Sequence, residues 1–486
     1  MEIPQTNYGY QSDDLIPRHR WLRLGPTNVS NVVFNPSNTT QVTIRIPGLS
    51  SINLSRSYIQ YSLPVPAGGA GLWTVVAENT VPFQSVQLQT STALNLADIQ
   101  YANKYVTAFQ PYRTSLEKGF LSGANDIMTQ NRCGFQLAQN NIQVCSQDGL
   151  TTGNVYAGPQ NLLDRQALSF SNQPNTAITI NKQVPLSTFV NTVLALDKTL
   201  FFPNDTYLVM NLCPLYQVFQ YVTNPQQPDK NVTLPTAAIT CSSFSLYLCI
   251  DVNTDISNNL KDDIAKGGMK IPVPFCYNQV LAVPGSVSQS NISFLVSKMN
   301  GRQLNSIAFA TFNSDTQTLK NYDMNNRCGC KIASYQTFMD STQLQNGSIN
   351  CFDANSQYNP LIWTGGVPYS YGDDYRVNSD FIRGTQIMSY PQYQNQFVNW
   401  DSFGCLPYAQ EDLNLNNQWW TSELSGLSLL APNSGDHSWS ISFVSSGCNP
   451  AASQNPSTNS VGLLLLVSCF FSRHMSIDAS GVYLSS

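Results

Sequence analysis

The chain has little charge, and the residue that it lacks most is glutamate. Only 11% of its 486 residues are Asp, Glu, Lys or Arg, which is less than half of the quarter found in ordinary globular proteins. Lys and Glu normally coat exposed helices, so their scarcity argues against a mainly helical protein. The many Val, Ile, Thr, Tyr and Phe residues, with 28 Gly and 27 Pro, favour short strands joined by turns instead. The five glutamates are Glu2, Glu78, Glu117, Glu411 and Glu423.

The chain also lacks a basic surplus, a secretory signal and a long apolar run. A net charge of −5 gives no footprint for wrapping nucleic acid or for sequence-specific binding to it. Arg18, His19, Arg20 and Arg23 form one small basic cluster, which we interpret as part of a solvated arm rather than a binding surface. The apolar run 461–471 is too short to cross a bilayer, and it predicts a buried strand.

The twelve cysteines are scattered and show no disulfide framework. Cys249 and Cys469 lie inside strand-like runs, where cysteine behaves as a small buried hydrophobe. This pattern predicts free thiols and assembly in a reducing compartment.

Alternation of apolar and polar residues predicts many half-buried strands. In the run 41–46, Val42, Ile44 and Ile46 alternate with polar residues. Many short strands with turns between them favour a sandwich or jelly roll over a parallel sheet. The other alternating runs are 176–180, 208–212, 244–250 and 439–443.

The two halves of the chain resemble each other weakly. A repeat of this length is too long for a solenoid, so it indicates two tandem domains of one kind, although coincidence in an Asn-rich chain is the alternative. The paired segments are 41–46 with 291–296, 57–61 with 306–310, and Gln130–Gly134 with Asn325–Gly329.

One segment has the spacing of an amphipathic helix. Leu186, Phe189, Val190, Val193 and Leu194 fall at i, i+3, i+4, i+7 and i+8, which predicts a helix over 186–198 with all five on one face. Pro203 closes the segment, and the strand 208–212 follows.

The same region resembles a segment of double jelly-roll major capsid proteins of tailless icosahedral DNA viruses, of the virophage and polinton-like type. The resemblance rests on Pro185-Leu186-Ser187, on Leu196-Asp197-Lys198 and on 203–210, and covers about thirty residues. Ser55–Tyr61 and the closing strand near 461–471 also lie where that family has strands.

The resemblance implies an all-β fold of two tandem eight-stranded jelly rolls, with short helices and long loops. We expect an N-terminal arm at 1–25, a first jelly roll at 26–255, a linker at 256–272 that is partly helical, and a second jelly roll at 273–486. It further implies a homotrimer that forms a pseudo-hexagonal tile of a virion shell, made in the host cell. The expected partners are neighbouring capsomers, penton and minor capsid proteins, and an internal membrane.

Motifs that carry chemistry are weak, and we predict no catalytic, cofactor or metal site. His19, His437 and His474 are the only histidines, and none stands in a hydrolase or zincin motif. Asp436-His437-Ser438 is better interpreted as a turn before a strand, and Gly68–Gly71 lacks the Lys-Ser/Thr of a phosphate loop.

Three other groups of residues are candidate ion sites. Cys328 and Cys330 would need Cys133 and Cys351 to complete a zinc site, and the spacing does not supply a second pair. Asp251–Asp255 begins like a calcium loop, with Asp262 at position twelve, but Ile256 replaces the required Gly, so helix capping is favoured. Asp373, Asp374 and Asp380 fit a solvated loop as well as a carboxylate pair.

Two other functions stay open beside the structural one. The first is a glycan-binding or viral attachment protein that uses Tyr- and Trp-rich loops at 110–165, 314–375 and 390–435. The second is an enzyme that depends on His437 or Asp374, which we do not expect. The sequence favours the capsid subunit.

Overall fold

The computed structural model describes fourteen stretches of the chain. They are 18–65, 72–75, 81–109, 178–222, 232–233, 236–283, 289–296, 303–313, 332–343, 349–350, 403–407, 427–428, 437–445 and 463–485.

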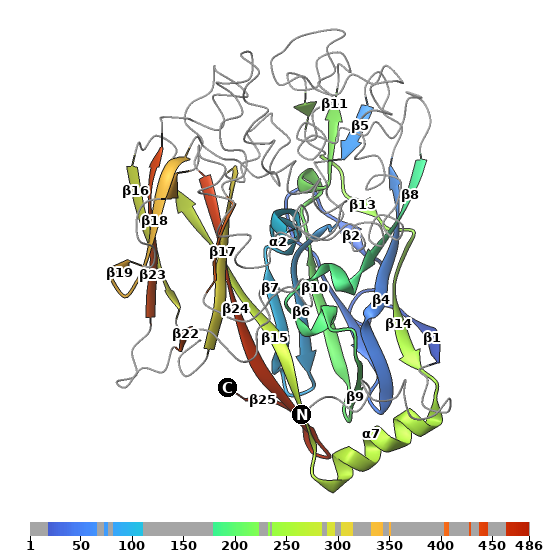
Figure 1. The fold of residues 1–486 in the computed structure, drawn as a ribbon. Coiled ribbons are helices and arrows are strands. Elements are labelled where there is room, and N and C mark those ends of the chain that lie inside the picture. Colours follow the sequence, from blue (N-terminus) through green and yellow to red (C-terminus); the bar gives the residue numbers. More distant parts are fainter. Residues whose placement is uncertain are drawn as a thin grey trace, which may run out of the picture.

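The first half of the chain forms a barrel of two facing sheets (Figure 1). Numbered along the chain from one to eight, its strands lie in the order 1-8-3-6 in one sheet and 2-7-4-5 in the other, all antiparallel. The eight strands are β1 (His19–Leu24), β3 (Gln41–Ile46), β4 (Ser50–Val65), β6 (Phe83–Thr90), β7 (Asn95–Gln100), β8 (Ile178–Pro185), β10 (Thr206–Leu212) and β14 (Ser243–Asp251).

The second half repeats this order. Its sheets run 1-8-3-6 and 2-7-4-5 again, with two short segments, β19 and β20, sharing the fifth place beside the fourth strand. The strands are β15 (Met269–Val283), β16 (Gln289–Val296), β17 (Gln303–Asn313), β18 (Ile332–Met339), β19 (Thr342–Gln343), β20 (Ile349–Asn350), β21 (Phe403–Pro407), β23 (His437–Ser445) and β24 (Leu463–Asp478).

Eight antiparallel strands wound in this order make a jelly roll, so the chain holds two of them. The duplication predicted from the sequence is confirmed for two pairs of strands. The segments 41–46 and 291–296 are β3 and β16, the second strand of each barrel, and 57–61 and 306–310 lie in β4 and β17, the third strands.

The third proposed pair is not equivalent, and that expectation was wrong. Gln130–Gly134 falls between the fifth and sixth strands of the first barrel, whereas Asn325–Gly329 falls between the third and fourth strands of the second. Both segments lie outside the described residues, but their places in the strand order differ. A short polar motif recurs by chance in an Asn-rich chain, whereas strand patterns are held in place by a buried face.

Smaller elements complete the fold. The strand β9 (Thr199–Phe202) extends the sheet along β4, and β25 (Gly481–Ser485) forms a hairpin with β24. The others are β2 (Val33–Phe34) paired with β13 (Ile239–Thr240), β5 (Leu72–Val75) with β11 (Phe219–Val222) and β12 (Val232–Thr233), β22 (Leu427–Ser428) on β17, the helices α2 (Ala102–Phe109) and α7 (Thr254–Lys266), and the 3-10 turns η4 (Leu186–Thr188), η5 (Val193–Ala195) and η6 (Leu215–Gln217).

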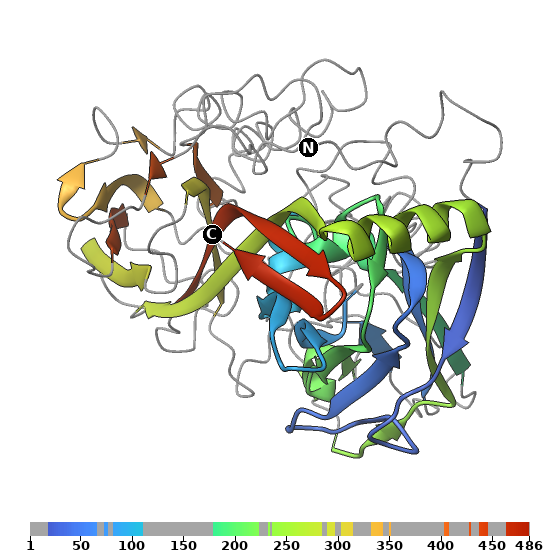
Figure 2. The same cartoon turned by 90° about the horizontal axis from the view of Figure 1, so that it is seen from below.

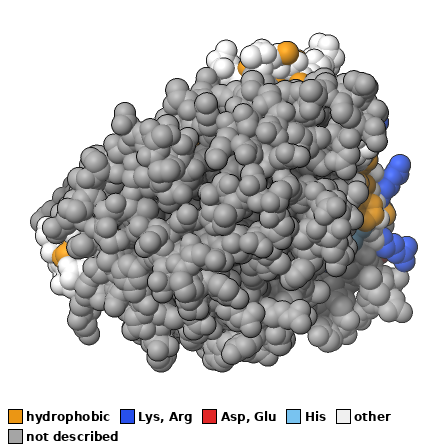
Figure 3. Space-filling model, turned by 90° about the horizontal axis from the view of Figure 1, so that it is seen from above, with side chains coloured by type: hydrophobic (Ala, Val, Ile, Leu, Met, Phe, Trp, Pro, Cys, Tyr) orange, Lys and Arg blue, Asp and Glu red, His pale blue; other side chains and the backbone are white. Residues whose placement is uncertain are grey.

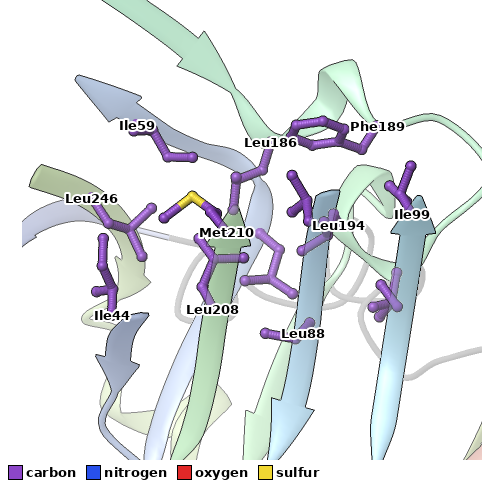
Figure 4. Packing of buried hydrophobic residues seen from close by; sticks show 14 of the residues in the cluster. Ile44, Ile59, Leu88, Ile99, Leu186, Phe189, Leu194, Leu208, Met210 and Leu246 are labelled. Atoms are coloured by element: carbon purple, nitrogen blue, oxygen red, sulfur yellow. The ribbon is translucent and has the colours of Figure 1, made fainter. Parts of the chain in front are cut away.

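The alternating patterns place their apolar residues as predicted. Along β3 the side chains of Val42, Ile44 and Ile46 are fully buried, and those of β10 and β14 meet them inside the first barrel. Figure 4 shows Ile44, Leu208 and Leu246 converging between the two sheets. The apolar run of the second half forms β24, in which 465–471 is buried.

The prediction of a helix over 186–198 is wrong, but the burial of its apolar residues is confirmed. The segment forms two separate 3-10 turns, η4 and η5, because Asn191 takes a positive φ of 57° and Thr192 is extended. All five apolar residues are nevertheless buried, and Figure 4 shows Leu186, Phe189 and Leu194 lying against the barrel core. The Thr192 hydroxyl accepts from the Leu194 N–H, which starts the second turn.

The expected N-terminal arm at 1–25 contains a strand of the barrel. β1 pairs with β14 from His19 to Leu24, so the basic cluster lies on a sheet edge and not on a free arm. The physical reason is that β1 completes the edge of β14, where Leu24 lies opposite Leu246 and packs against the barrel core. The division at 255 and 273 stays a prediction; β14 ends at Asp251 and β15 begins at Met269.

The connection between the barrels is a capped helix, α7. The Asn253 side chain accepts from the Asp255 N–H at the start, and Gly268 takes a positive φ of 82° after the end, so both helix termini are capped. Ile256, Leu260 and Ile264 face the core at four-residue spacing. The predicted helix capping by 251–255 is confirmed at Asn253.

A charge placed in the 186–198 segment tests its burial. We expect Phe189→Asp or Val193→Asp to abolish soluble protein, because losing a buried Phe costs about 3–5 kcal/mol even without a buried charge. Leu49→Asp is the matched control, since Leu49 is exposed and its positive φ suits Asp. The measurement is soluble yield and thermal unfolding; folded protein from both core variants would contradict the burial.

Candidate assembly surfaces

The two barrels share one hydrophobic core. The cluster that fills the first barrel continues into the second through β15, β24 and β25. Figure 1 shows β15 and β24 standing between the remainder of the second barrel and the strands β6 and β7 of the first. The second-barrel members of the cluster are Met269, Ile271, Val273, Cys276, Leu466, Phe470, Met475, Ile477 and Val482.

A buried asparagine fastens the barrels at one point. The Asn278 side chain on β15 accepts from the Gln100 N–H at 2.9 Å and donates to the Gln100 carbonyl. Gln100 ends β7, the last strand of its sheet, so its backbone has no further strand to pair with. The amide of Asn278 replaces that missing strand and thereby protects a sheet edge.

At the base of the molecule the last hairpin of the second barrel reaches under the first. Figure 2 shows the β24–β25 hairpin lying beside α7 beneath the first barrel. The Asn204 side chain, on the turn before β10, donates to the Ser480 carbonyl of the hairpin at 3.3 Å. The same turn leaves no room beside Gly48, where a Cβ atom would lie 2.6 Å from the Asn204 carbonyl carbon.

The residues that carried the family resemblance meet in one network. Asp197 accepts from Arg56 at 3.0 Å, from Asn53 at 2.9 Å and from Ser55 at 3.2 Å, so it joins the Leu196-Asp197-Lys198 and Ser55-Arg56-Ser57 motifs. Burial would raise the pKa of Asp197, but these hydrogen bonds outweigh it and lower the pKa. The network fixes the irregular stretch of β4.

The Ser57 hydroxyl supplies hydrogen bonds where the β14–β4 pairing is interrupted. The register between β14 and β4 shifts between Tyr247 and Cys249, where β4 holds extra residues. The buried Ser57 hydroxyl accepts from the Cys249 N–H at 2.9 Å and donates to the Asn53 carbonyl at 2.7 Å. Every backbone group named here has a partner, which suits a bulge inside a buried sheet.

The outer face of the β1-β14-β4 sheet carries large side chains. Trp21 on β1 is 50% exposed, and its indole N–H donates to the Arg56 carbonyl at 3.2 Å. Tyr58 and Tyr247 stack with their ring centroids 5.0 Å apart, and the Arg23 guanidinium donates to the Ser245 hydroxyl at 3.0 Å. Figure 3 shows hydrophobic and basic side chains together on the side of the molecule where Figure 1 places β1.

The histidines and acidic residues weighed as chemical groups do not come together. His19 lies in β1, His437 begins β23 and His474 lies in β24, on three different strands. No group of three metal-binding side chains occurs within the described part of the chain. The remaining candidates lie outside the described residues: Gly68–Gly71, Cys133, Cys328, Cys330, Cys351, Asp373, Asp374, Asp380 and Asp436.

The side chains of five cysteines are described: Cys241, Cys249, Cys276 and Cys469 are free thiols, and Cys213 is buried. Burial raises the pKa of Cys249 to about 11 and that of Cys241 to about 12, and it also raises the pKa of Cys276 and Cys469. These thiols are therefore poor nucleophiles and act as core residues. Among the described helices, none has the length and apolar character needed to span a bilayer.

Sequence reasoning missed the residues that shape these surfaces. Asn278 is a polar residue in the middle of a fifteen-residue strand, and this placement is the sequence feature that could have indicated a buried hydrogen bond. Trp21 stands between arginines at 20 and 23, but the cluster was assigned to an arm.

This geometry defines a double jelly-roll protein in which the two barrels are joined through a shared core. Solved structures of the same fold cover almost the whole chain. VP54 of PBCV-1, fitted into a reconstruction of the virophage Sputnik, matches with a TM-score of 0.51 at 9% identity over 98% of each chain. A chain of the Sputnik virophage structure matches with a TM-score of 0.53 at 12% identity over 96% of this chain and 88% of that one.

The Faustovirus major capsid protein matches with a TM-score of 0.50 at 9% identity, over 95% of this chain and 91% of that one. At such identities the likeness shows the fold, and the expected double jelly roll is confirmed. No family model and no curated protein matches the sequence.

Asn278→Leu tests the fastening between the barrels. The substitution keeps the volume but leaves the Gln100 N–H and carbonyl without the amide, and each orphaned group costs about 1–3 kcal/mol. We expect a lower thermal unfolding midpoint and faster proteolysis. Asn204→Leu is the matched control, because it removes an exposed bond between the barrels. Equal midpoints for both variants would contradict the role of Asn278.

Acid tests the Asp197 network. Because the folded-state pKa of Asp197 is lowered, its contribution to stability is present above the unfolded-state value near 3.8 and is lost as pH falls through the folded-state value. The half-exposed pair is expected to contribute no more than about 1 kcal/mol. The unfolding free energies of wild type and Asp197→Asn should thus differ at pH 6, and the difference should shrink as the pH falls below 3.8. A difference that stays constant as the pH falls further would refute it.

Proposed function

We propose that this protein is the major capsid subunit of an icosahedral DNA virus. Its building block is a homotrimer whose six barrels form a pseudo-hexagonal tile. The observation that carries the proposal is the pair of jelly rolls of identical strand order, joined side by side in one chain. Of the three matched structures named above, one is the Faustovirus major capsid protein, one is a chain of the Sputnik virophage, and one is PBCV-1 VP54 fitted into a Sputnik reconstruction. Their folds cover nearly all of this chain.

The chemistry of the chain supports a structural role. Repeated contacts over symmetric copies hold a shell without any single strong interaction, and interface centres contain few charged residues. A chain with 11% charged residues is suited to such contacts. We place the protein in the virion shell, with neighbouring capsomers, penton and minor capsid proteins as partners and an internal membrane as a candidate neighbour.

Assembly in a reducing compartment agrees with the free thiols of Cys241, Cys249, Cys276 and Cys469. The glycan-binding alternative depends on loops outside the described residues, and it has no support in the described part of the chain. Catalysis is not part of the proposal.

The mass in solution and the shape of the particles test the proposal together. We expect a species of about 160 kDa, three times the 53.7 kDa of the chain, that negative-stain microscopy shows as hexagonal tiles or hollow shells. The preparation needs reducing buffer, and the cysteines should titrate as free thiols. A folded monomer that forms neither tiles nor shells, and that binds a sugar with saturation, would favour the attachment protein instead.

A further inference from the structure

The interface between the two barrels inside one chain lies on a sheet face that occurs twice in the molecule. In both barrels the eighth strand shifts register against the third, at Tyr247 in β14 and at Phe470 in β24. Aligning the two shifts makes Tyr247 equivalent to Phe470 and Ser245 equivalent to Ser468. On the first strand of each barrel, Arg23 opposite Tyr247 then corresponds to Cys276 opposite Phe470.

These equivalent positions point out of their own barrels. Tyr247 lies between Leu246 and Leu248, which are buried inside the first barrel, so its side chain is on the outer face. In the same way, Cys469 and Phe471 are buried but do not belong to the hydrophobic cluster of the first barrel. Phe470, which lies between them, does belong to that cluster, so its side chain points out of the second barrel. The two outer faces are thus the same surface of a repeated fold.

The two copies of this surface differ in what covers them. In the second barrel it is closed by the first barrel, and Phe470 and Cys276 are buried at 0% and 1% exposure. In the first barrel it is open: Arg23 is exposed, Trp21 is half exposed, and Tyr58 and Tyr247 are partly exposed. Trp, Tyr and Arg are the residues that carry most binding energy at protein interfaces.

The other end of the molecule offers the complementary sheet. Figure 1 places β16, β18 and β23 at the side of the second barrel that is farthest from β1. Trp439, Ile441 and Thr337 are buried, so the positions that alternate with them face outward. These outward positions carry small or uncharged side chains. The described outward side chains are Ser293, Gln336, Phe338, Ser440 and Ser442.

Charge does not oppose this arrangement. Arg18, Arg20 and Arg23 gather on one edge of the first barrel, and the described outward side chains of the β16-β23-β18 sheet carry no positive charge that would repel them. Opposite ends of one molecule that fit each other form a head-to-tail contact, which closes into a ring when the rotation per copy is a whole fraction of a turn.

We propose that the outer face of the β1-β14-β4 sheet, centred on Trp21, Arg23, Tyr58 and Tyr247, is the surface that receives a second copy of this chain. The second copy contributes the β16-β23-β18 sheet of its second barrel. This contact repeats between chains the contact that β15 and β24 make with the first barrel within a chain. The inference rests on the proposed capsid function and names the surface that closes the trimer.

Two variants and a control test this surface in the full-length chain. Trp21→Glu and Arg23→Glu change exposed side chains, so thermal unfolding should match wild type, while the trimer should dissociate at least about 30-fold more readily. Tyr483→Glu is the matched control, since Tyr483 is an aromatic residue with 48% exposure on β25, away from this sheet. Analytical ultracentrifugation over a concentration series measures the dissociation.

A cross-link identifies the partner surface directly. A photoreactive phenylalanine at position 21, in a mixture of isotopically light and heavy chains, should give mixed cross-links to peptides from 289–296, 332–343 or 437–445. This result does not depend on whether Trp21→Glu folds. Intact trimers from both Glu variants, or mixed cross-links confined to other segments, would overturn the inference and leave the trimer standing. A wild-type chain that stays at 53.7 kDa would overturn the proposed function itself.

Discussion

The burial of one barrel's outer sheet face by the other barrel is the constraint on which the structure depends. The side chains of Phe470, Leu466 and Cys276, on strands of the second barrel, pack in the hydrophobic core of the first. Because an apolar sheet face exposed to water would invite aggregation, neither barrel is complete without its neighbour. The polar pair of Asn278 with Gln100 fixes the direction of this contact, since only one register lets the amide meet both backbone groups.

A duplicated fold with one covered and one open copy of the same surface has a direct consequence for assembly. The covered copy shows which contact the fold tolerates, and in the proposed assembly the open copy, with Trp21 and Tyr247, receives another chain. In that assembly, function arises from repetition of a packing contact more than from the chemistry of single groups. The buried thiols and the scattered histidines are consistent with a protein that acts through its surfaces.

Local networks keep the irregular parts of the barrels in place. The Asp197 carboxylate, the Ser57 hydroxyl and the close approach at Gly48 each satisfy or accommodate backbone that leaves the regular ladder. Two of the three lie in motifs that resembled a known family. Those motifs are thus structural, because they hold a bulge in the third strand and the turn that faces it. The half-exposed ion pair of Arg56 with Asp197 fixes the backbone geometry there and adds little to the free energy of unfolding.

The sequence by itself determined the all-β class, the strands β3, β10, β14, β23 and β24, and the equivalence of β3 with β16, because alternation of buried and exposed residues is a local property. The tertiary structure decided the rest. The 186–198 segment has helical spacing but buries its residues in two turns, since barrel packing outweighs propensity. Strand order, the place of β1 and the partner of Asn278 depend on residues far apart in the chain, which no local pattern records.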